Sequence, residues 1–434
     1  MMSRSGTTPP LPRNSPVFAF VFHFFCFMFA AILLAGCLGD DKSSDLPSGT
    51  RDGMTIQNDE STLNDRVTDR NDTLGLDTLS PSPSPTDSIA VSGKVAASGK
   101  TLTMTLVAEI APPVVNGDTL QATSVNLKGG FAYVSYNYQG EAYRGGVDVI
   151  QIKNESKAEI RSQVLFSDAD VHALHYDGDL YLATGTSNEA YGSPAVLERI
   201  GENGGKLELK ERERVGLGSF AGTSVVVNGK QVYATSGNTG GLKVLNQTGL
   251  TTASTETLAD ARWVDVDDTR VVVVQGMPGR IAVYTKSTLN LANTWTFTGA
   301  NVPEAKTTVR VLGGKALIAA GTGGVQLMNL ATGKIVGSVP VPVVAGLSAD
   351  RSVSNAADAD KDLIYVSNGE AGVYAVASSS DLTSSTGDNN VTLTVLGRLR
   401  FANLQSVNHV AFDGNTLVVA AGKGGVKVVS VKWR

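Results

Sequence analysis

The sequence predicts an all-β fold made of seven similar four-stranded units, and three observations support this prediction. Short apolar strands separated by Gly or Asp turns recur over residues 101–434, without the 3.6-residue periodicity of long helices. The chain contains 47 glycines, many of them at the expected turns. The aligned second strands, 39 to 54 residues apart, contain Tyr133, Tyr181, Tyr233, Val272, Leu317, Ile364 and Val418. A period of this size is typical of one blade of a β-propeller, so we predict a seven-bladed β-propeller.

Three units show the repeat most clearly. In residues 223–245 a strand, an Asn-Gly turn and a second strand are followed by a Gly-Gly turn and a third strand. The same order recurs in residues 308–328 and 408–429. Looser copies begin near Thr123, His172, Arg262 and Ser354.

The fourth strand of the last unit is expected to come from the other end of the domain. The seventh unit reaches Arg434 directly after its third strand, whereas Leu102–Ile110 forms an extra strand before the first unit. Pairing these two segments would close the ring and leave no open edge between the first and last blades. We therefore expect the propeller to cover residues 101–434, which gives about 48 residues for each unit.

The third strands resemble those of LVIVD-repeat propellers. Gly241-Leu-Lys-Val-Leu and Gly425-Val-Lys-Val-Val resemble the repeat of that family, which places a Gly-Leu/Val-x-Val/Ile-Val segment after a Gly turn. The Asp that often follows this segment in the family is replaced here by Asn246, Asn329 and Ser430. The resemblance covers most of residues 102–434, and it implies a propeller found in bacterial surface and exported proteins.

Residues 1–36 are predicted to be a lipoprotein signal peptide. Arg4 and Arg13 provide a positive start, and an apolar run occupies residues 17–35. The run ends in Leu34-Ala35-Gly36-Cys37, which resembles the bacterial lipobox, where the Cys is lipidated and becomes the first residue of the mature chain. The alternative is a transmembrane anchor, because a run of about 20 apolar residues can span a bilayer.

Residues 37–100 are expected to form the lipidated Cys37 and a disordered tether. Ser, Thr, Asp, Asn and Pro dominate this segment, so it has too little apolar surface to offset the entropy of ordering. Leu38 stands where an Asp would signal inner-membrane retention, and it resembles an outer-membrane address. Asp40 and Asp41 resemble a surface-export signal, although acidic residues are also common in linkers.

A polar ring is predicted where the first strand of each unit enters the central channel. Its members are Thr123, His172, Thr223, Arg262, Thr307, Ser354 and Asn408. One interpretation is a ligand ring, in which Arg262 binds an anion and His172 titrates. The other is a water-filled channel in which these side chains satisfy the blade edges by hydrogen bonding.

Two long loops between second and third strands are the main binding candidates. Four of the 11 tyrosines lie in these loops. Tyr and Arg side chains combine a large contact area with a polar end, which suits binding. The candidate residues are Tyr136, Tyr138, Tyr143, Arg144 and Tyr191. The alternative is that the two loops only pack on each other.

No cofactor or metal is predicted. His172, His175 and His409 do not have metal-ligand spacing, and the segment Asp358–Asp362 lacks the Gly and Glu of a calcium loop. We find no phosphate loop and no nucleophile elbow. A net charge of -5 argues against nucleic-acid binding.

The sequence therefore favours a non-enzymatic lipoprotein of the outer membrane or cell surface. Its propeller would bind a protein or polysaccharide partner through the loop-rich face, and its oligomeric state stays open. The alternative is an enzyme, a hydrolase or lyase on a carbohydrate or small anion, using Arg262, His172 and Asp170 at the channel. A third hypothesis is an assembly scaffold in an envelope complex.

Overall fold

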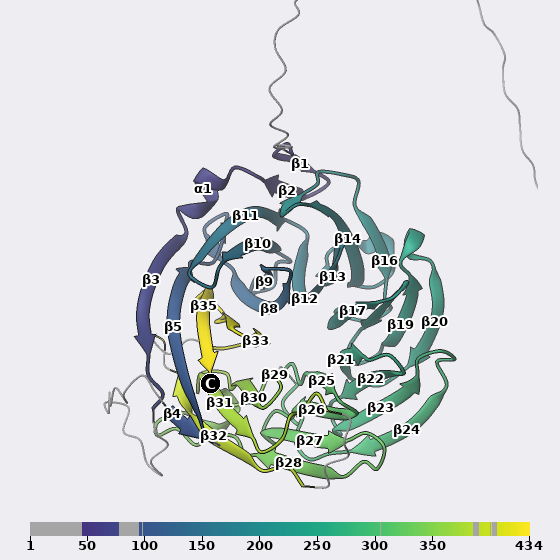
Figure 1. Ribbon diagram of the computed structural model, residues 1–434. Helices are drawn as coiled ribbons and strands as arrows, with labels where there is room; N and C mark the ends of the chain where they lie inside the picture. Colours follow the sequence, from purple (N-terminus) through teal and green to yellow (C-terminus); the bar gives the residue numbers. More distant parts are fainter. Residues whose placement is uncertain are drawn as a thin grey trace, which may run out of the picture. The chain divides into compact units, whose positions relative to one another are not determined.

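The computed structural model shows seven antiparallel sheets arranged in a closed ring (Figure 1). It describes residues 46–77, 95–97, 99–303, 305–384, 390–399, 401 and 406–434. The expected signal peptide and Cys37 lie outside the described residues. The predicted seven-bladed β-propeller is confirmed, with each blade running from an inner strand at the channel to an outer strand at the rim.

The first four blades follow the chain in order. Blade 1 contains β8 (Gln121–Lys128), β9 (Phe131–Asn137), β10 (Gly145–Lys153) and β11 (Lys157–Phe166). Blade 2 contains β12 (Ala169–Asp177), β13 (Asp179–Thr186) and β14 (Ala195–Asn203), with the fourth position divided between β15 (Lys206–Leu207) and β16 (Glu213–Gly216). Blade 3 contains β17 (Ser224–Asn228), β18 (Gln231–Thr235), β19 (Gly241–Asn246) and β20 (Thr252–Thr257). Blade 4 contains β21 (Ala261–Val266), β22 (Arg270–Gln275), β23 (Arg280–Thr285) and β24 (Leu291–Thr296).

The last three blades complete the ring. Blade 5 contains β25 (Val309–Leu312), β26 (Lys315–Ala319), β27 (Val325–Asn329) and β28 (Ile335–Val339). Blade 6 contains β29 (Ala356–Asp360), β30 (Leu363–Ser367), β31 (Val373–Ser378) and β32 (Leu393–Leu399). Blade 7 contains β33 (His409–Asp413), β34 (Thr416–Ala420), β35 (Val426–Trp433) and β5 (Lys100–Ile110). The connections include the hairpin of β6 (Val114–Val115) and β7 (Asp118–Thr119), and 3-10 turns at Glu189–Tyr191, Thr248–Leu250 and Ala349–Arg351.

The predicted ring closure is confirmed by the pairing of β5 with β35. The two strands are antiparallel, from Val426 opposite Ile110 to Trp433 opposite Leu102. The closure joins two segments that are more than 300 residues apart in the sequence (Figure 1). It also supplies the fourth strand that the seventh unit lacks.

The hydrophobic core is divided into seven clusters, each lying between two neighbouring blades. The middle strands therefore bury both of their faces. In β22, Val272 and Val274 face blade 5, whereas Val271 and Val273 face blade 3. This explains why the middle strands read as continuous apolar runs rather than as alternating patterns.

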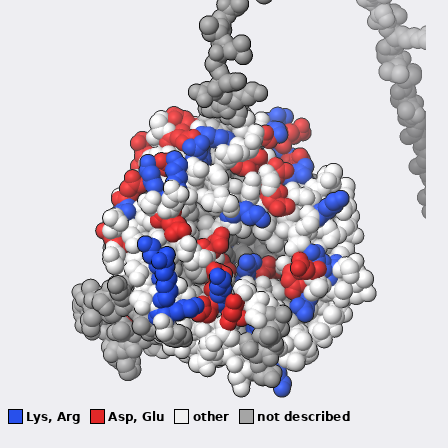
Figure 2. Space-filling model, in the orientation of Figure 1, with Lys and Arg blue, Asp and Glu red and all other residues white. Residues whose placement is uncertain are grey.

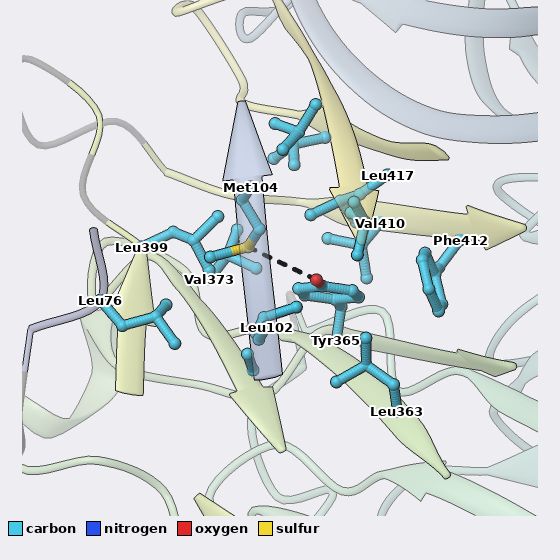
Figure 3. Close-up of a cluster of buried hydrophobic side chains, with 14 of the residues drawn as sticks. Leu76, Leu102, Met104, Leu363, Tyr365, Val373, Leu399, Val410, Phe412 and Leu417 are labelled. Atoms are coloured by element: carbon cyan, nitrogen blue, oxygen red, sulfur yellow. Dashed lines mark hydrogen bonds between the residues drawn. The ribbon is translucent and has the colours of Figure 1, made fainter. Parts of the chain in front are cut away.

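The cluster between blades 6 and 7 contains the closing strand (Figure 3). Met104 of β5 is buried there, and its Sδ accepts a hydrogen bond from the Tyr365 hydroxyl of β30 at 3.4 Å. The Tyr365 ring also packs edge-on against Phe412 of β33. The ring is thus closed by side-chain packing as well as by backbone pairing.

The expectation of a disordered tether up to residue 100 is wrong for residues 46–77. Strands β1 (Gly49–Arg51) and β2 (Met54–Gln57) extend the outer edge of blade 1, and β3 (Val67–Leu74) pairs with β5 of blade 7. The helix α1 (Glu60–Asn64) connects them, and β4 (Val95–Ala97) pairs with the start of β5.

A few apolar residues are enough to order this polar segment. Met54, Ile56, Leu63 and Leu76 are buried in the clusters formed by blades 1, 2, 6 and 7. The two sheet edges satisfy the backbone hydrogen bonds of the added strands. Composition predicted disorder because it could not show that folded sheet edges were available for pairing.

Candidate functional site

The loops between second and third strands and the loops that lead into each first strand share one side of the ring, which we call the loop face. A pocket of about 750 Å³ opens there at the central channel, and we call it the loop-face pocket. Its polar lining residues include Gln121, Thr123, Asn137, His172, Thr223, Asn238, Asp260, Arg262, Lys306, Asn355 and Asn408.

Five of the seven predicted ring residues line this pocket, namely Thr123, His172, Thr223, Arg262 and Asn408. Thr307 is fully buried beside Arg262. Ser354 does not line the pocket, and the next residue, Asn355, does so instead. The Ser354 hydroxyl bonds to the Asn368 Oδ1 atom at 2.6 Å, so the predicted register is wrong by one residue in this unit.

Most ring side chains bond to the backbone of the next blade. Each donates to the carbonyl group that precedes the corresponding ring residue of that blade. The bonds are Thr123 to Val171 (2.8 Å), Thr223 to Ala261 (2.8 Å), Asn355 to Val407 (3.2 Å) and Asn408 to Ala122 (2.8 Å). These contacts favour the hydrogen-bonded channel over the ligand ring, because the side chains satisfy blade edges.

A second layer of such bonds lies deeper in the channel, and the sequence analysis missed it. Here the side chain accepts a backbone N–H from the next blade. The acceptors and donors are Asn126 and Tyr176, Ser224 and Val264, Asp265 and Val311, Thr308 and Ala357, Asp358 and Phe412, and His409 and Val125. The signal was available, because a polar residue stands within one or two positions of the apolar residue in each first strand.

Arg262 is occupied by the protein itself. Its guanidinium makes two hydrogen bonds to the Asp260 carboxylate, at 3.0 and 2.8 Å. The remaining Nη1 group donates to the carbonyl oxygens of Val302 and Ala305 at 2.9 and 3.1 Å. The side chain is 5% exposed. Arg262 therefore holds the segment before blade 5 in place and does not present a free anion donor.

His172 and Asp170 do not act at the same place: His172 lines the pocket, whereas Asp170 bonds to the backbone of a loop. The His172 Nδ1 atom lies 3.5 Å from the Asn137 amide nitrogen, and burial lowers the pKa of His172 to about 4. Asp170 Oδ1 accepts the backbone N–H groups of Tyr138 and Arg144 at 3.0 and 3.1 Å. Burial raises the pKa of Asp170 to about 6. Among the described residues that line the pocket, His172 is included and Asp170 is not.

Three side chains from different blades lie across the channel. The Lys306 Nζ atom donates to the carbonyl oxygen of His172 at 2.7 Å and lies 5.7 Å from the centre of the Trp263 ring. Trp263 in turn stacks on His409, with ring centres 5.2 Å apart. Burial lowers the pKa of Lys306 to about 8. These groups separate the loop-face pocket from the opposite opening of the channel, which Trp263 and His409 line.

The opposite opening is predominantly acidic, because its lining contains one arginine, Arg310, and four aspartates, Asp265, Asp358, Asp360 and Asp413. Arg310 lies between Asp265 and Asp358, with nitrogen-to-oxygen distances of 3.5 and 3.4 Å. These carboxylates raise the pKa of Arg310. Figure 2 shows one face of the ring, with acidic and basic side chains interspersed around a central hollow. Within the described part of the chain, no group of three or more His, Cys, Asp or Glu residues is arranged to hold a metal ion.

One of the five loop candidates is wrong. Tyr136 belongs to β9 rather than to a loop, is fully buried, and donates its hydroxyl to Asp148 Oδ2 at 2.8 Å. Strand β9 continues to Asn137, so the loop begins later than the sequence indicated.

The other four candidates are half-buried on the loop face. The Arg144 guanidinium lies over the Tyr138 ring at 5.6 Å and pairs with Asp118 of β7. Arg214 lies over the Tyr191 ring at 5.0 Å. The Tyr143 ring lies beside Gly185 close to His172. These side chains are partly used in packing, and they keep part of their surface accessible.

Exposed apolar side chains on the loop face are the feature that sequence reasoning missed. The described residues contain six exposed large hydrophobic side chains, and four of them lie in the connections between strands on this face. The four are Val114 (58% exposed), Phe220 (70%), Met277 (57%) and Val343 (89%). They come from connections of different blades, so only the folded ring reveals that they share a face.

Comparison with one solved structure supports the fold. The structure of U3-55K matches with a TM-score of 0.53 and 13% identity, covering 74% of this chain and 98% of that one. The WD40 β-propeller domain of Doa1 has a TM-score of 0.49 and 10% identity over 74% of this chain and 96% of its own. BamB from Moraxella catarrhalis has a TM-score of 0.45 and 12% identity over 79% and 95%. At these identities the likeness concerns the fold alone.

No family model and no curated protein sequence matches this chain. The resemblance to LVIVD-repeat propellers therefore stays a prediction. A search of the described residues finds no helix that is both long and apolar enough to cross a membrane.

The buried histidine of the channel predicts a pH effect on stability. Burial lowers the pKa of His409 to about 3, whereas an unfolded histidine titrates near 6.5. Below pH 6.5 the unfolded chain therefore binds a proton that the folded chain does not, and His409 lowers stability as the pH falls. The unfolding free energy of His409→Asn, minus that of the wild type, should rise by about 1 kcal/mol for each unit from pH 6 to pH 4.

Chemical denaturation of both proteins at several pH values measures this difference. His172, His175 and Asp170 also titrate in this range, but they are present in both proteins and cancel in the comparison. A difference that is independent of pH would show that His409 is not buried in its neutral form.

Proposed function

We propose that this protein is a binding module whose loop face docks a protein partner. The observation that carries the proposal is the placement of Val114, Phe220, Met277 and Val343 on that face. Exposed apolar surface that is surrounded by polar residues marks protein interaction sites when it is contiguous. The rigid ring would hold the loops in place, so that docking would cost little conformational entropy.

The composition of the face fits a protein better than a glycan. Phe220 and Met277 stand at the rim of the loop-face pocket, and the partly accessible Tyr138, Tyr143 and Tyr191 add aromatic groups with polar ends. Aromatic residues and Met are enriched in protein interfaces. The aliphatic Val114 and Val343 suit apolar partner side chains rather than sugar hydroxyls.

Catalysis in the channel has less support. The reaction considered above needs a free Arg262, a titrating His172 and an available Asp170. Arg262 is paired with Asp260, and Asp170 anchors a loop outside the pocket lining. His172 is neutral at pH 7 because burial lowers its pKa to about 4. We therefore place binding before an enzymatic role.

Site-specific photo-crosslinking in cells tests the docking face. A photoreactive amino acid at position 220, 277 or 343 should give the same discrete protein adduct, because all three sites lie on the proposed interface. Positions 291 and 335 are matched controls, since Leu291 and Ile335 are exposed apolar residues of the outer strands β24 and β28. Equal adducts from all five positions, or adducts from the outer strands alone, would contradict the proposal.

We also propose that Cys37 anchors the protein by a lipid, with the outer membrane as the expected site. The support is the Leu34–Cys37 motif after an apolar run. Only eight residues, 38–45, separate Cys37 from the first described residue, Leu46. Such a linker reaches at most about 30 Å. In this proposal the propeller therefore stays close to the membrane, rather than at the end of a long stalk.

Replacing Cys37 tests the anchor. Cys37→Ser should move the protein from the membrane fraction to the soluble fraction, because the thiol that carries the lipid is gone. Cell fractionation and the mass of the mature N-terminus measure the two parts of this prediction. An unchanged membrane association of Cys37→Ser would instead support the transmembrane alternative.

A further inference from the structure

The loop-face pocket contains the ammonium group of Lys306, and none of the described side chains balances its positive charge. Its charged lining residues are Asp260, Arg262 and Lys306. Asp260 and Arg262 pair with each other at 2.8 Å. None of the described carboxylates pairs with Lys306, whose Nζ atom donates to the backbone oxygen of His172. An ammonium group has three donors, so the contact with His172 leaves donors available on the pocket side.

The same pocket has unused amide groups. The Asn137 Oδ1 atom is buried and lacks a hydrogen-bond partner. Buried polar atoms without a partner are rare, and a bound water, ion or ligand group is one way to satisfy them. The side-chain amides of Gln121 and Asn238 also line the pocket, and they make no hydrogen bond to the described residues. Each amide offers both donors and an acceptor, which matches the hydroxyl groups of a ligand.

Size and shape limit the ligand further. A volume of about 750 Å³ is within the usual range of small-molecule pockets. Phe220 lies at the rim with 70% of its surface exposed, so its ring offers an apolar face to a cyclic ligand. The pocket thus combines one unpaired cation, several free amides and one aromatic edge.

We propose that the loop-face pocket binds a sugar acid, with the carboxylate at Lys306 and the hydroxyl groups at the amides of Gln121, Asn137 and Asn238. A neutral sugar would leave the ammonium group unpaired. A simple carboxylate would leave the amides unused. This inference goes beyond partner docking, because it concerns a small molecule inside the pocket, and Phe220 at the pocket rim is shared with the proposed docking face.

The electrostatics of the pocket agree with an anionic ligand. Burial lowers the pKa of Lys306 to about 8, so the protein environment opposes its charge. The neighbouring histidines, His172 and His409, are held neutral by burial, and Arg262 is neutralised by Asp260. A bound carboxylate would supply the missing negative charge.

Titration calorimetry with free small molecules tests the proposal. The probes are glucuronate, which has a carboxylate and hydroxyls, glucose, which has hydroxyls alone, and propionate, which has a carboxylate alone. Glucuronate should bind at least tenfold more tightly than either of the others. Lys306→Met should weaken glucuronate binding at least tenfold. Lys423→Met is the matched control, because Lys423 is exposed on the same face outside the pocket lining, and it should leave binding unchanged.

A second variant keeps the test decisive if Lys306→Met folds poorly. The double variant Gln121→Ala, Asn238→Ala leaves the charge in place and should weaken the binding of glucuronate but not of propionate. Equal affinity for glucose and glucuronate, or full binding by Lys306→Met, would overturn the proposal. Equal affinity for propionate and glucuronate would also overturn it, and would point to a carboxylate site for an acidic side chain. The photo-crosslinking result does not affect this test, because no partner protein is present.

Discussion

The inner strand of each blade has one edge without a neighbouring strand, and the rest of the structure depends on how that edge is satisfied. Its backbone groups face a narrow channel and need hydrogen-bond partners. At six of the seven blade junctions, a polar side chain in or next to one inner strand accepts a backbone N–H of the next inner strand. Asp265, for example, accepts the N–H of Val311, and Thr123 in addition donates to the carbonyl of Val171. The polar channel residues therefore act first as connections between blades.

This constraint determines where function can lie. The channel uses its most reactive groups internally, as Arg262 and Asp260 show. The loops are not needed to hold the blades together, because strand pairing and the seven inter-blade clusters already do so. They are free to differ in length and to expose side chains such as Phe220 and Val343. The result is a rigid ring with one variable face, and a central pocket in which Lys306 alone keeps an unpaired charge among the described residues.

The repeats predicted the fold well, since strand spacing and turn glycines are local properties. Ring closure by Leu102–Ile110 was also predictable, because the count of strands left one blade incomplete. The order of residues 46–77 was not predictable, since it depends on the free edges of blades 1 and 7. At the channel, the sequence predicted the polar ring but not the hydrogen bonds that its side chains make to the next blade. Tyr136 was misplaced because strand length in β9 is set by pairing with β10, not by composition.

Hydrogen exchange at the inner strands shows whether side chains of one blade satisfy the backbone of the next. We expect the amide protons of Val311 and Phe412 to exchange as slowly as those of the middle strands, because Asp265 and Asp358 accept their hydrogen bonds. Asp265→Ala should accelerate exchange at Val311 and leave Phe412 protected, as measured by mass spectrometry with residue-level resolution. Fast exchange at both amides in the wild-type protein would show that water, rather than the next blade, satisfies the inner edges, and would contradict the account.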